Sequence, residues 1–190
     1  GPTIEDGFYY DFDFTKPISN EDLEVIEKEM YKIISNGANI EKVYKKKDEV
    51  RALFSSRKED YKINIIDESE QEENFSIYCQ KNTNFIDLCR GPHLPSLKHI
   101  GAFKLTKISG AYWRGNSKNK MLQRIYGTAW KNKKDLETYL NMLTEAEKRD
   151  HRKIGKQLNL FHMQEEATGS VFWHHKGWSI YLEIENYMRE

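Results

Sequence analysis

The sequence lacks the features that mark secreted and membrane proteins. Its only cysteines are Cys79 and Cys89, which are too few for a disulfide framework or a four-cysteine zinc site and fit a reducing compartment. No apolar run approaches the roughly 20 residues of a membrane span, and no basic start, apolar run and small-residue cleavage site forms a signal peptide. These absences predict a cytoplasmic protein with no membrane partner.

Acidic residues are absent from one long segment. Residues 98–134 carry ten Lys or Arg and no Asp or Glu, whereas residues 1–30 carry nine Asp or Glu and only two Lys. Aromatic residues are interleaved with the basic ones: Tyr112, Trp113, Tyr126 and Trp130. Such a segment suits a phosphate backbone with stacked bases. The alternative is a solvated basic face that the acidic N-terminal segment balances.

One short motif gathers three chemically active side chains. Residues 85–89 read as a strand that a Gly-Pro pair ends. Because side chains alternate along a strand, Asp87 and Cys89 point to the face opposite Ile86 and Leu88. His93 follows the turn, which can fold its imidazole back toward Cys89. A thiol, an imidazole and a carboxylate suit a metal half-site or a hydrolytic centre, and the simpler alternative is a buried cysteine and a surface histidine near a turn.

Hydrophobic periodicity predicts an α+β domain with a largely antiparallel sheet and flanking helices. In residues 7–14, aromatic side chains at every second position form one face of a strand, and Tyr9 falls on the polar face. A helix is expected to begin at Ser19 and to end at the Asn-Gly pair 36–37. Its predicted buried stripe comprises Leu23, Ile26, Met30 and Ile33.

The middle of the chain is predicted to be mostly strand. Strands are expected at residues 38–45, 61–66, 75–80, 103–108 and 121–130. Asp48 is expected to cap a short helix that turns Val50, Leu53 and Phe54 inward. The acidic run 67–73 and the glycine-punctuated residues 109–117 are predicted loops, and binding groups often lie on such loops. Cys79 is in phase with the apolar side of strand 75–80 and is predicted to be part of the core.

The last third of the chain is predicted to be helical. A helical stripe begins near residue 132, and a break is expected near residues 150–151. Short pieces of a different domain follow at residues 160–163 and 169–177, before a helix that starts at Ser179. Four histidines in this region have no ligand-like spacing, so we predict structural or surface roles for them: His151, His162, His174 and His175.

Six segments closely resemble the bacterial-type threonyl-tRNA synthetase family, and they run nearly end to end. They include Asp-Leu-Cys-Arg-Gly-Pro-His at 87–93 and Gly-Ala-Tyr-Trp-Arg-Gly-Asn-Ser at 110–117, besides residues 1–11, 121–130, 149–158 and 172–178. The resemblance implies that residues 1–131 are an editing domain without its N-terminal part. It further implies that residues 132–150 are a linker helix and that 151–190 begin a class II catalytic domain.

The resemblance also implies partners and cofactors. The family attaches threonine to tRNA(Thr) with ATP, acts as a homodimer in the cytoplasm and does not bind DNA. Its ATP and magnesium sites lie beyond Glu190, so this chain alone is not expected to aminoacylate. Because one missing methyl group is worth only about 10–200-fold in a binding pocket, the family hydrolyses mischarged seryl-tRNA(Thr) at a second, editing site.

The family's editing site combines His-x-x-x-His with Cys-x-x-x-His, and this chain has only the second pair, Cys89 and His93. The first pair is therefore expected upstream of Gly1. Related deacylases hold zinc with such ligands. Cys89 and His93 are accordingly a half-site for zinc, and tight zinc binding by this chain is not expected.

The resemblance suggests roles for four catalytic residues. His93 positions or deprotonates water, Asp87 binds the substrate amine or orients a histidine, and Lys62 holds phosphate or ribose or stabilises negative charge. Cys89 is a metal ligand, a general base as thiolate, or a wall of the pocket. Substrate or tRNA contacts are expected from Tyr9, Tyr10, Arg90, Lys107, Tyr112, Trp113, Arg114, Lys118, Lys120 and Arg124. Two other readings are a free-standing aminoacyl-tRNA deacylase and a non-catalytic module that binds the acceptor arm of tRNA.

Overall fold

The computed structural model describes residues 2–189 and confirms the α+β class. The chain forms two compact units, Gly1–Lys133 and Lys134–Glu190. All strand pairs in both units are antiparallel, as predicted, but the first unit contains two sheets where the sequence predicts one.

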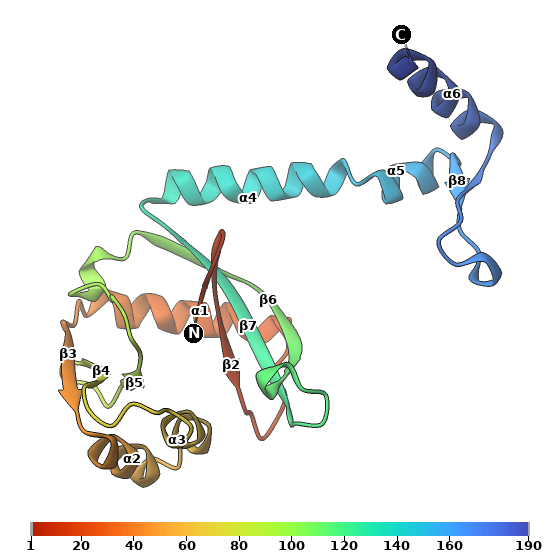
Figure 1. Ribbon diagram of the computed structural model, residues 1–190. Helices are drawn as coiled ribbons and strands as arrows, with labels where there is room; N and C mark the ends of the chain where they lie inside the picture. Colours follow the sequence, from red (N-terminus) through yellow and green to blue (C-terminus); the bar gives the residue numbers. More distant parts are fainter. Residues whose placement is uncertain (1, 190) are drawn as a thin grey trace. The chain divides into compact units, whose positions relative to one another are not determined.

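The larger sheet of the first unit has the strand order β1-β2-β7-β6. Its strands are β1 (Thr3–Ile4), β2 (Gly7–Phe12), β7 (Met121–Trp130) and β6 (Ala102–Tyr112). Helix α1 (Asn20–Ser35) packs along this sheet (Figure 1). The predicted aromatic face of residues 7–14 is confirmed, because Phe8, Phe12 and Phe14 pack around the buried core of Leu23, Leu105 and Ile125.

Helix α1 begins and ends where the sequence predicts. The backbone N–H of Ser19 donates to the Asp22 carboxylate at 2.7 Å, and Gly37 terminates the helix with a φ of 62°. The predicted buried stripe is wrong at Ile33, which is 42% exposed. The half-buried Ile34 takes the inward position, since positions three and four residues after Met30 both satisfy the helical period.

The smaller sheet has the order β3-β4-β5 and is covered by two short helices. The strands are β3 (Ile40–Lys45), β4 (Phe75–Gln80) and β5 (Ile86–Leu88), and the helices are α2 (Lys47–Ser56) and α3 (Asp60–Asp67). The core between them comprises Val50, Phe54, Ile66, Phe75 and Ile77. Cys79 packs against this core, as predicted. Asp48 is not the cap of α2, because the helix begins at Lys47 and Asp48 lies in its first turn.

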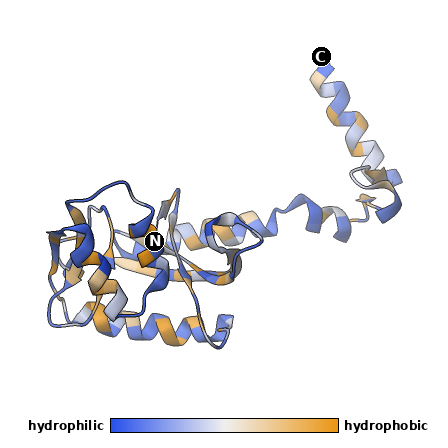
Figure 2. Ribbon diagram, turned by 60° about the horizontal axis from the view of Figure 1, so that its bottom comes forward, coloured by the Kyte–Doolittle hydropathy of each residue, from blue (hydrophilic) through white to orange (hydrophobic). Residues whose placement is uncertain are grey.

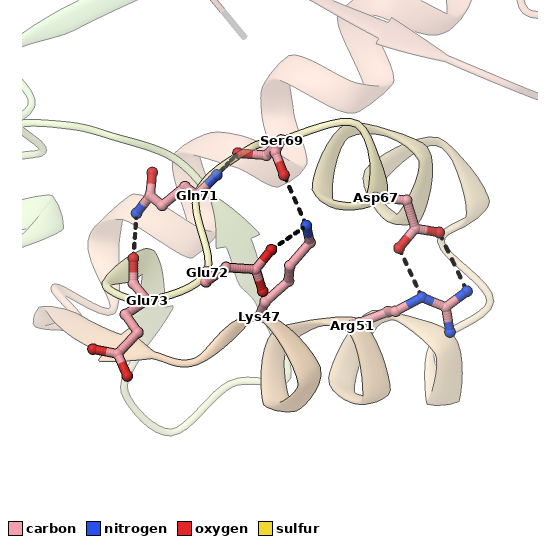
Figure 3. A network of polar contacts seen from close by, with 7 residues as sticks. All are labelled: Lys47, Arg51, Asp67, Ser69, Gln71, Glu72 and Glu73. Atoms are coloured by element: carbon pink, nitrogen blue, oxygen red, sulfur yellow. Dashed lines mark hydrogen bonds and ion pairs between the residues drawn. The ribbon is translucent and has the colours of Figure 1, made fainter.

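The predicted strand at residues 61–66 is wrong, because these residues form helix α3. Their alternating aliphatic pattern suits a strand, but Ile63 and Ile66 are also spaced three apart and both reach the core beside α2. Packing on α2 therefore decides between two patterns that the sequence leaves close. A polar network lies where α3 ends (Figure 3): Arg51 of α2 pairs with Asp67 of α3 at 2.7 Å, and Lys47 of α2 holds the loop that follows through Glu72 at 3.0 Å.

Strand β6 is longer than predicted and replaces the first part of the expected loop 109–117. It runs to Tyr112, and a 3-10 turn, Trp113–Gly115, leads to the tip of the β6–β7 hairpin. Arg114 in this turn has a φ of 57°. A β-bulge lies between Leu105 and Lys107, where β6 has one residue more than β7.

Gly7 is required by a close approach of two strands. A Cβ atom at this position would overlap the carbonyl oxygen of Gly127 on β7. We expect Gly7→Ala to lower the free energy of unfolding by roughly 1–3 kcal/mol or more, because backbone cannot move aside as a side chain can. Gly110→Ala is the control, since its Cβ would meet only the flexible side chain of Met121 at 3.0 Å. Equal urea midpoints for the two variants would contradict this account.

The second unit consists of helices joined by a short β-ribbon. Helix α4 (Lys133–Lys148) precedes α5 (His151–Gln157), and the ribbon pairs β8 (Phe161–His162) with β9 (Phe172–Trp173) before α6 (His175–Arg189). The predicted break is confirmed, because Asp150 caps α5 by accepting the N–H of Arg152 at 2.9 Å. Helix α6 begins four residues earlier than predicted. No described helix has the length and apolar character that a membrane span requires.

Two of the four C-terminal histidines have structural roles, as predicted. His162 Nδ1 lies 2.7 Å from His174 Nε2, and His174 Nδ1 lies 3.1 Å from the carbonyl oxygen of Asn159. Since a carbonyl oxygen only accepts, Nδ1 of His174 is the donor in the hydrogen bond to Asn159. Figure 2 shows hydrophobic residues along α6, and Ile180, Ile184 and Met188 are exposed there.

Candidate functional site

Asp87 lies at the centre of a cluster built from three elements of the first unit. It projects from β5 and is only 7% exposed. Lys62 of α3 approaches its Oδ1 atom at 2.8 Å, and the Tyr10 hydroxyl of β2 donates to the same atom at 3.2 Å. Both donors contact Oδ1, and neither of these two contacts is made to Oδ2.

The pKa values of this cluster follow from its burial and charges. Burial and the negative charge of Asp87 raise the pKa of Tyr10 to about 12. Burial alone would lower the pKa of Lys62, but its hydrogen bonds to Asp87 and Glu59 raise it above the ordinary value. Lys62 therefore remains an ammonium group and Tyr10 a hydrogen-bond donor over the physiological pH range.

The imidazole of His93 lies on the ring of Tyr78. The ring centroids are 3.9 Å apart and the planes are within 12°. Tyr78 is the direct cross-strand partner of Asp87, so this stacking brings His93 to the same side of the small sheet as the carboxylate. Burial lowers the pKa of His93 below its ordinary value, and the charge of Asp87 opposes this shift. His93 is thus neutral at pH 7.

Cys89 and His93 do not make a metal site by themselves. No group of three or more His, Cys, Asp or Glu side chains among residues 2–189 could hold a metal ion. Zinc in proteins takes three or four protein ligands, so the two residues present do not fit it on their own. Cys89 Sγ instead accepts the N–H of Gly91 at 3.4 Å, which fixes the turn that leads to His93.

Two residues of the cluster are absent from the sequence-based prediction. Glu59, which caps α3, lies 2.6 Å from Lys62, and Tyr78 carries the His93 ring. Glu59 is three residues before Lys62, a spacing that brings side chains together in a helix. The alternating pattern of residues 61–66 predicts a strand, in which this spacing has no such meaning.

Three of the predicted substrate or tRNA contacts are paired with carboxylates in this structure. Arg124 binds Asp11 through two hydrogen bonds of 2.6 and 2.8 Å, and Lys120 lies 2.7 Å from Asp13. Arg114 pairs with Glu68 of the α3 end. The basic segment and the acidic N-terminal segment therefore meet at the Arg124–Asp11 and Lys120–Asp13 pairs, as expected if two oppositely charged faces balance each other.

Aromatic rings and cations alternate on the face of the large sheet that is opposite α1. Arg124 lies 3.9 Å from the centroid of the Tyr9 ring, and Lys107 lies 4.7 Å from that of Tyr126. The Tyr9 and Tyr126 rings are 5.8 Å apart. At the hairpin tip, Trp113 contacts Tyr61 of α3 with ring centroids 4.8 Å apart.

The other predicted contact residues are distributed around these groups. Arg90 is exposed in the turn after β5, and its carbonyl oxygen accepts a hydrogen bond from Lys42 at 3.2 Å. Tyr112 is 38% exposed at the end of β6, and Lys118 is exposed in the hairpin tip.

Comparison with known proteins gives the family. Residues 75–126 match the model of the Threonyl and Alanyl tRNA synthetase second additional domain. Threonine–tRNA ligases from Marinobacter nauticus and Ehrlichia canis are 57% and 58% identical to the chain over its whole length. The chain belongs to the threonyl-tRNA synthetase family. It spans about 30% of the length of these curated relatives, covering 29% of the first and 30% of the second.

The matched domain covers only part of the Asp87 cluster of this chain. Residues 75–126 include Asp87, Cys89 and His93, but Lys62 and Tyr10 lie outside them. The two additional residues reach Asp87 because α3 and β2 pack beside the matched strands. The cluster is therefore assembled by the fold of the first unit and not by the domain motif alone.

The raised pKa of Tyr10 predicts a loss of stability in alkali. Because the folded state favours the neutral phenol, the stabilisation is complete below pH 10 and is lost as the pH rises from 10 through about 12. We expect tyrosinate absorbance after a rapid pH jump to show a late-titrating tyrosine that Tyr10→Phe removes. Tyr61, whose pKa is also raised to about 12, remains as the internal control. Titration of Tyr10 near pH 10 would contradict the cluster geometry.

Proposed function

We propose that this chain forms the region of a threonine–tRNA ligase that hydrolyses mischarged seryl-tRNA(Thr). The observation that supports this function is the buried Asp87 carboxylate, which Lys62 and Tyr10 both contact at Oδ1. In the proposal, Oδ2 accepts from a donor of the ligand. The α-amine of an aminoacyl ester is such a donor and is cationic near neutral pH. In the whole protein, the editing region serves a homodimeric ligase in the cytoplasm.

The reaction is hydrolysis of the ester between serine and the terminal ribose of tRNA. The substrate amine binds Asp87, which places the ester carbonyl beside the Lys62 ammonium. His93, which is neutral at pH 7, takes a proton from a water molecule while the water oxygen bonds to the ester carbonyl carbon. Lys62 stabilises the oxyanion that forms. The bond to the ribose oxygen then breaks, and the proton passes to that oxygen, which releases serine and tRNA.

Cys89 acts in this proposal as a structural part of the site. Its Sγ accepts from Gly91 and so sets the turn before His93. Zinc has no step in the proposal because Cys89 and His93 provide only two ligands. A zinc ion held together with further ligands remains a separate proposal, and its test is zinc content of the natural protein with and without Cys89→Ala.

The acceptor end of the tRNA is proposed to lie on the ring-and-cation face of the large sheet and on the β6–β7 hairpin. Lys107 and Lys118 are exposed there and offer charge to phosphate, while Tyr9 and Tyr126 offer rings for bases. When RNA binds, three basic side chains leave their carboxylate partners and pair with phosphate groups: Arg114, Lys120 and Arg124. Binding that depends on these contacts weakens steeply with salt.

The test is deacylation of seryl-tRNA(Thr) by the natural protein that carries this chain. We expect seryl-tRNA(Thr) to be hydrolysed and threonyl-tRNA(Thr) to be spared, and Cys89→Ala to lose hydrolysis while it retains salt-sensitive tRNA binding. If the natural protein binds tRNA but does not hydrolyse seryl-tRNA(Thr), the region is a binding module for the acceptor arm and the proposal fails.

A further inference from the structure

Glu59 is held rigidly at the turn between α2 and α3. The turn passes through Lys58, which has a φ of 58°, and the Glu59 N–H donates to the carbonyl oxygen of Phe54 at 3.0 Å. The Glu59 carbonyl oxygen accepts the N–H of Lys62 at 3.0 Å, so its backbone begins α3. The side chain therefore starts from a fixed point one helical turn before Lys62.

The Glu59 carboxylate binds two cations, one on each oxygen. Lys62 lies 2.6 Å from Oε2 and Arg57 lies 2.6 Å from Oε1. The side chains are mostly buried, with 19% of Lys62 and 26% of Glu59 exposed. Burial alone would raise the pKa of Glu59, but the two cations hold it below the ordinary value. The carboxylate is therefore charged at neutral pH.

These contacts make a row of alternating charge: Arg57, Glu59, Lys62 and Asp87. The Lys62 ammonium lies between two carboxylates, at 2.6 Å from Glu59 and 2.8 Å from Asp87. A third group over Lys62 is the ring of Phe54, whose centroid is 4.9 Å from the ammonium. Lys62 therefore shares its charge between Glu59 and Asp87.

The shared charge matters for a cationic ligand. An ammonium group that binds Asp87 Oδ2 must approach Lys62, which carries the same charge. A carboxylate on the far side of Lys62 offsets that repulsion and leaves more of the negative charge of Asp87 for the ligand. With Glu59 the row of Arg57, Glu59, Lys62 and Asp87 has no net charge, and without Glu59 the remaining three groups have a net charge of +1, which disfavours an ammonium ligand.

We propose that Glu59 is a positioning residue that makes the Asp87 site selective for a cationic amine, by taking up part of the charge of Lys62. This inference rests on the proposed function, because it names the ligand group that Asp87 binds. A purely structural role for Glu59, as the residue that begins α3, predicts instead that all ligands are affected alike.

The experiment uses two stable ester analogues and isothermal titration calorimetry with this chain. One is adenosine with serine joined to the 3′ position through an amide, and the other is its N-acetylated form, which has no charge on the amine. We expect Glu59→Gln to raise the Kd of the first compound about tenfold at pH 6.5 and to leave that of the second unchanged. The difference disappears above the amine pKa of about 8, and Glu59→Asp restores part of the affinity.

Two further variants separate the possible failures. Asp67→Asn removes a carboxylate of α3, the helix that also carries Lys62, where it pairs with Arg51 of α2. We expect it to leave both Kd values unchanged. If Asp87→Asn weakens the free amine compound but Glu59→Gln does not, the proposed site stands and the role of Glu59 is refuted. If Asp87→Asn has no effect, or the unmodified chain binds neither compound, the proposed site fails and the inference fails with it. Equal weakening of both compounds by Glu59→Gln supports the structural role alone.

Discussion

Asp87→Asn is expected to lower kcat/KM for hydrolysis of seryl-tRNA(Thr) by about 100-fold or more, which corresponds to about 2.7 kcal/mol of transition-state stabilisation. The substitution keeps the shape of the side chain and an oxygen that can accept from Tyr10, but it removes the charge to which we assign binding of the substrate amine. Lys62 retains Glu59 as a partner, so no buried ammonium is left alone. The measurement is single-turnover deacylation by the natural protein that carries this chain.

The control for this prediction is Asp67→Asn. Asp67 is also a carboxylate of the first unit in an ion pair, at 2.7 Å from Arg51, but it lies in the network of Figure 3 at the end of α3, apart from the Asp87 cluster. We expect its deacylation rate to equal that of the unmodified protein. An Asp87→Asn variant that unfolds at the same urea concentration and deacylates within threefold of the unmodified protein would rule out the amine-binding role.

Phe54→Ala is expected to lower the free energy of unfolding by about 3–5 kcal/mol. Phe54 is fully buried at the centre of the core between α2, α3 and the small sheet. Its removal leaves a cavity that the surrounding rigid strands cannot fill. Because its ring also lies 4.9 Å from the Lys62 ammonium, we expect the variant to lose part of the ligand affinity of the Asp87 site as well.

Urea unfolding followed by circular dichroism measures this loss of stability. Ile65→Ala is the matched control, since Ile65 lies on the adjacent helix but is 44% exposed, and we expect a change below about 1 kcal/mol. If Phe54→Ala and Ile65→Ala unfold at the same urea concentration, the core is not where the structure places it.

The sequence predicts the strands of this chain better than it predicts how they are grouped. Strands at 75–80 and 121–130 have the predicted bounds, because alternation and turn residues are local signals. The division into two sheets depends on which strands pair across long separations, such as β2 with β7. Nothing local in residues 7–12 distinguishes that partner from β4 or β5.

The candidate site shows the same limit. The motif around Asp87 is visible in the sequence, because its carboxylate, thiol and imidazole lie within seven residues. The predicted role of Lys62 rests on the family resemblance. Its contact with Glu59 requires helix α3, which the sequence pattern does not predict. The pairing of Arg124 with Asp11 is likewise a product of register, since the two residues are direct cross-strand neighbours that lie far apart in the chain.

The bulge in β6 has a consequence for how this strand tolerates changes in its length. Leu105 pairs with Gly127 and Lys107 pairs with Tyr126. Thr106, which lies between them, has no cross-strand partner on β7. Deletion of Thr106 would leave every other pair in place, with Leu105 still facing the core and Lys107 still facing outward. Deletion at another position of β6 would shift the residues on one side of that position by one place, and their side chains would then point to the opposite face of the sheet. The strand thus holds one dispensable residue, and natural variation in its length is expected to fall at Thr106.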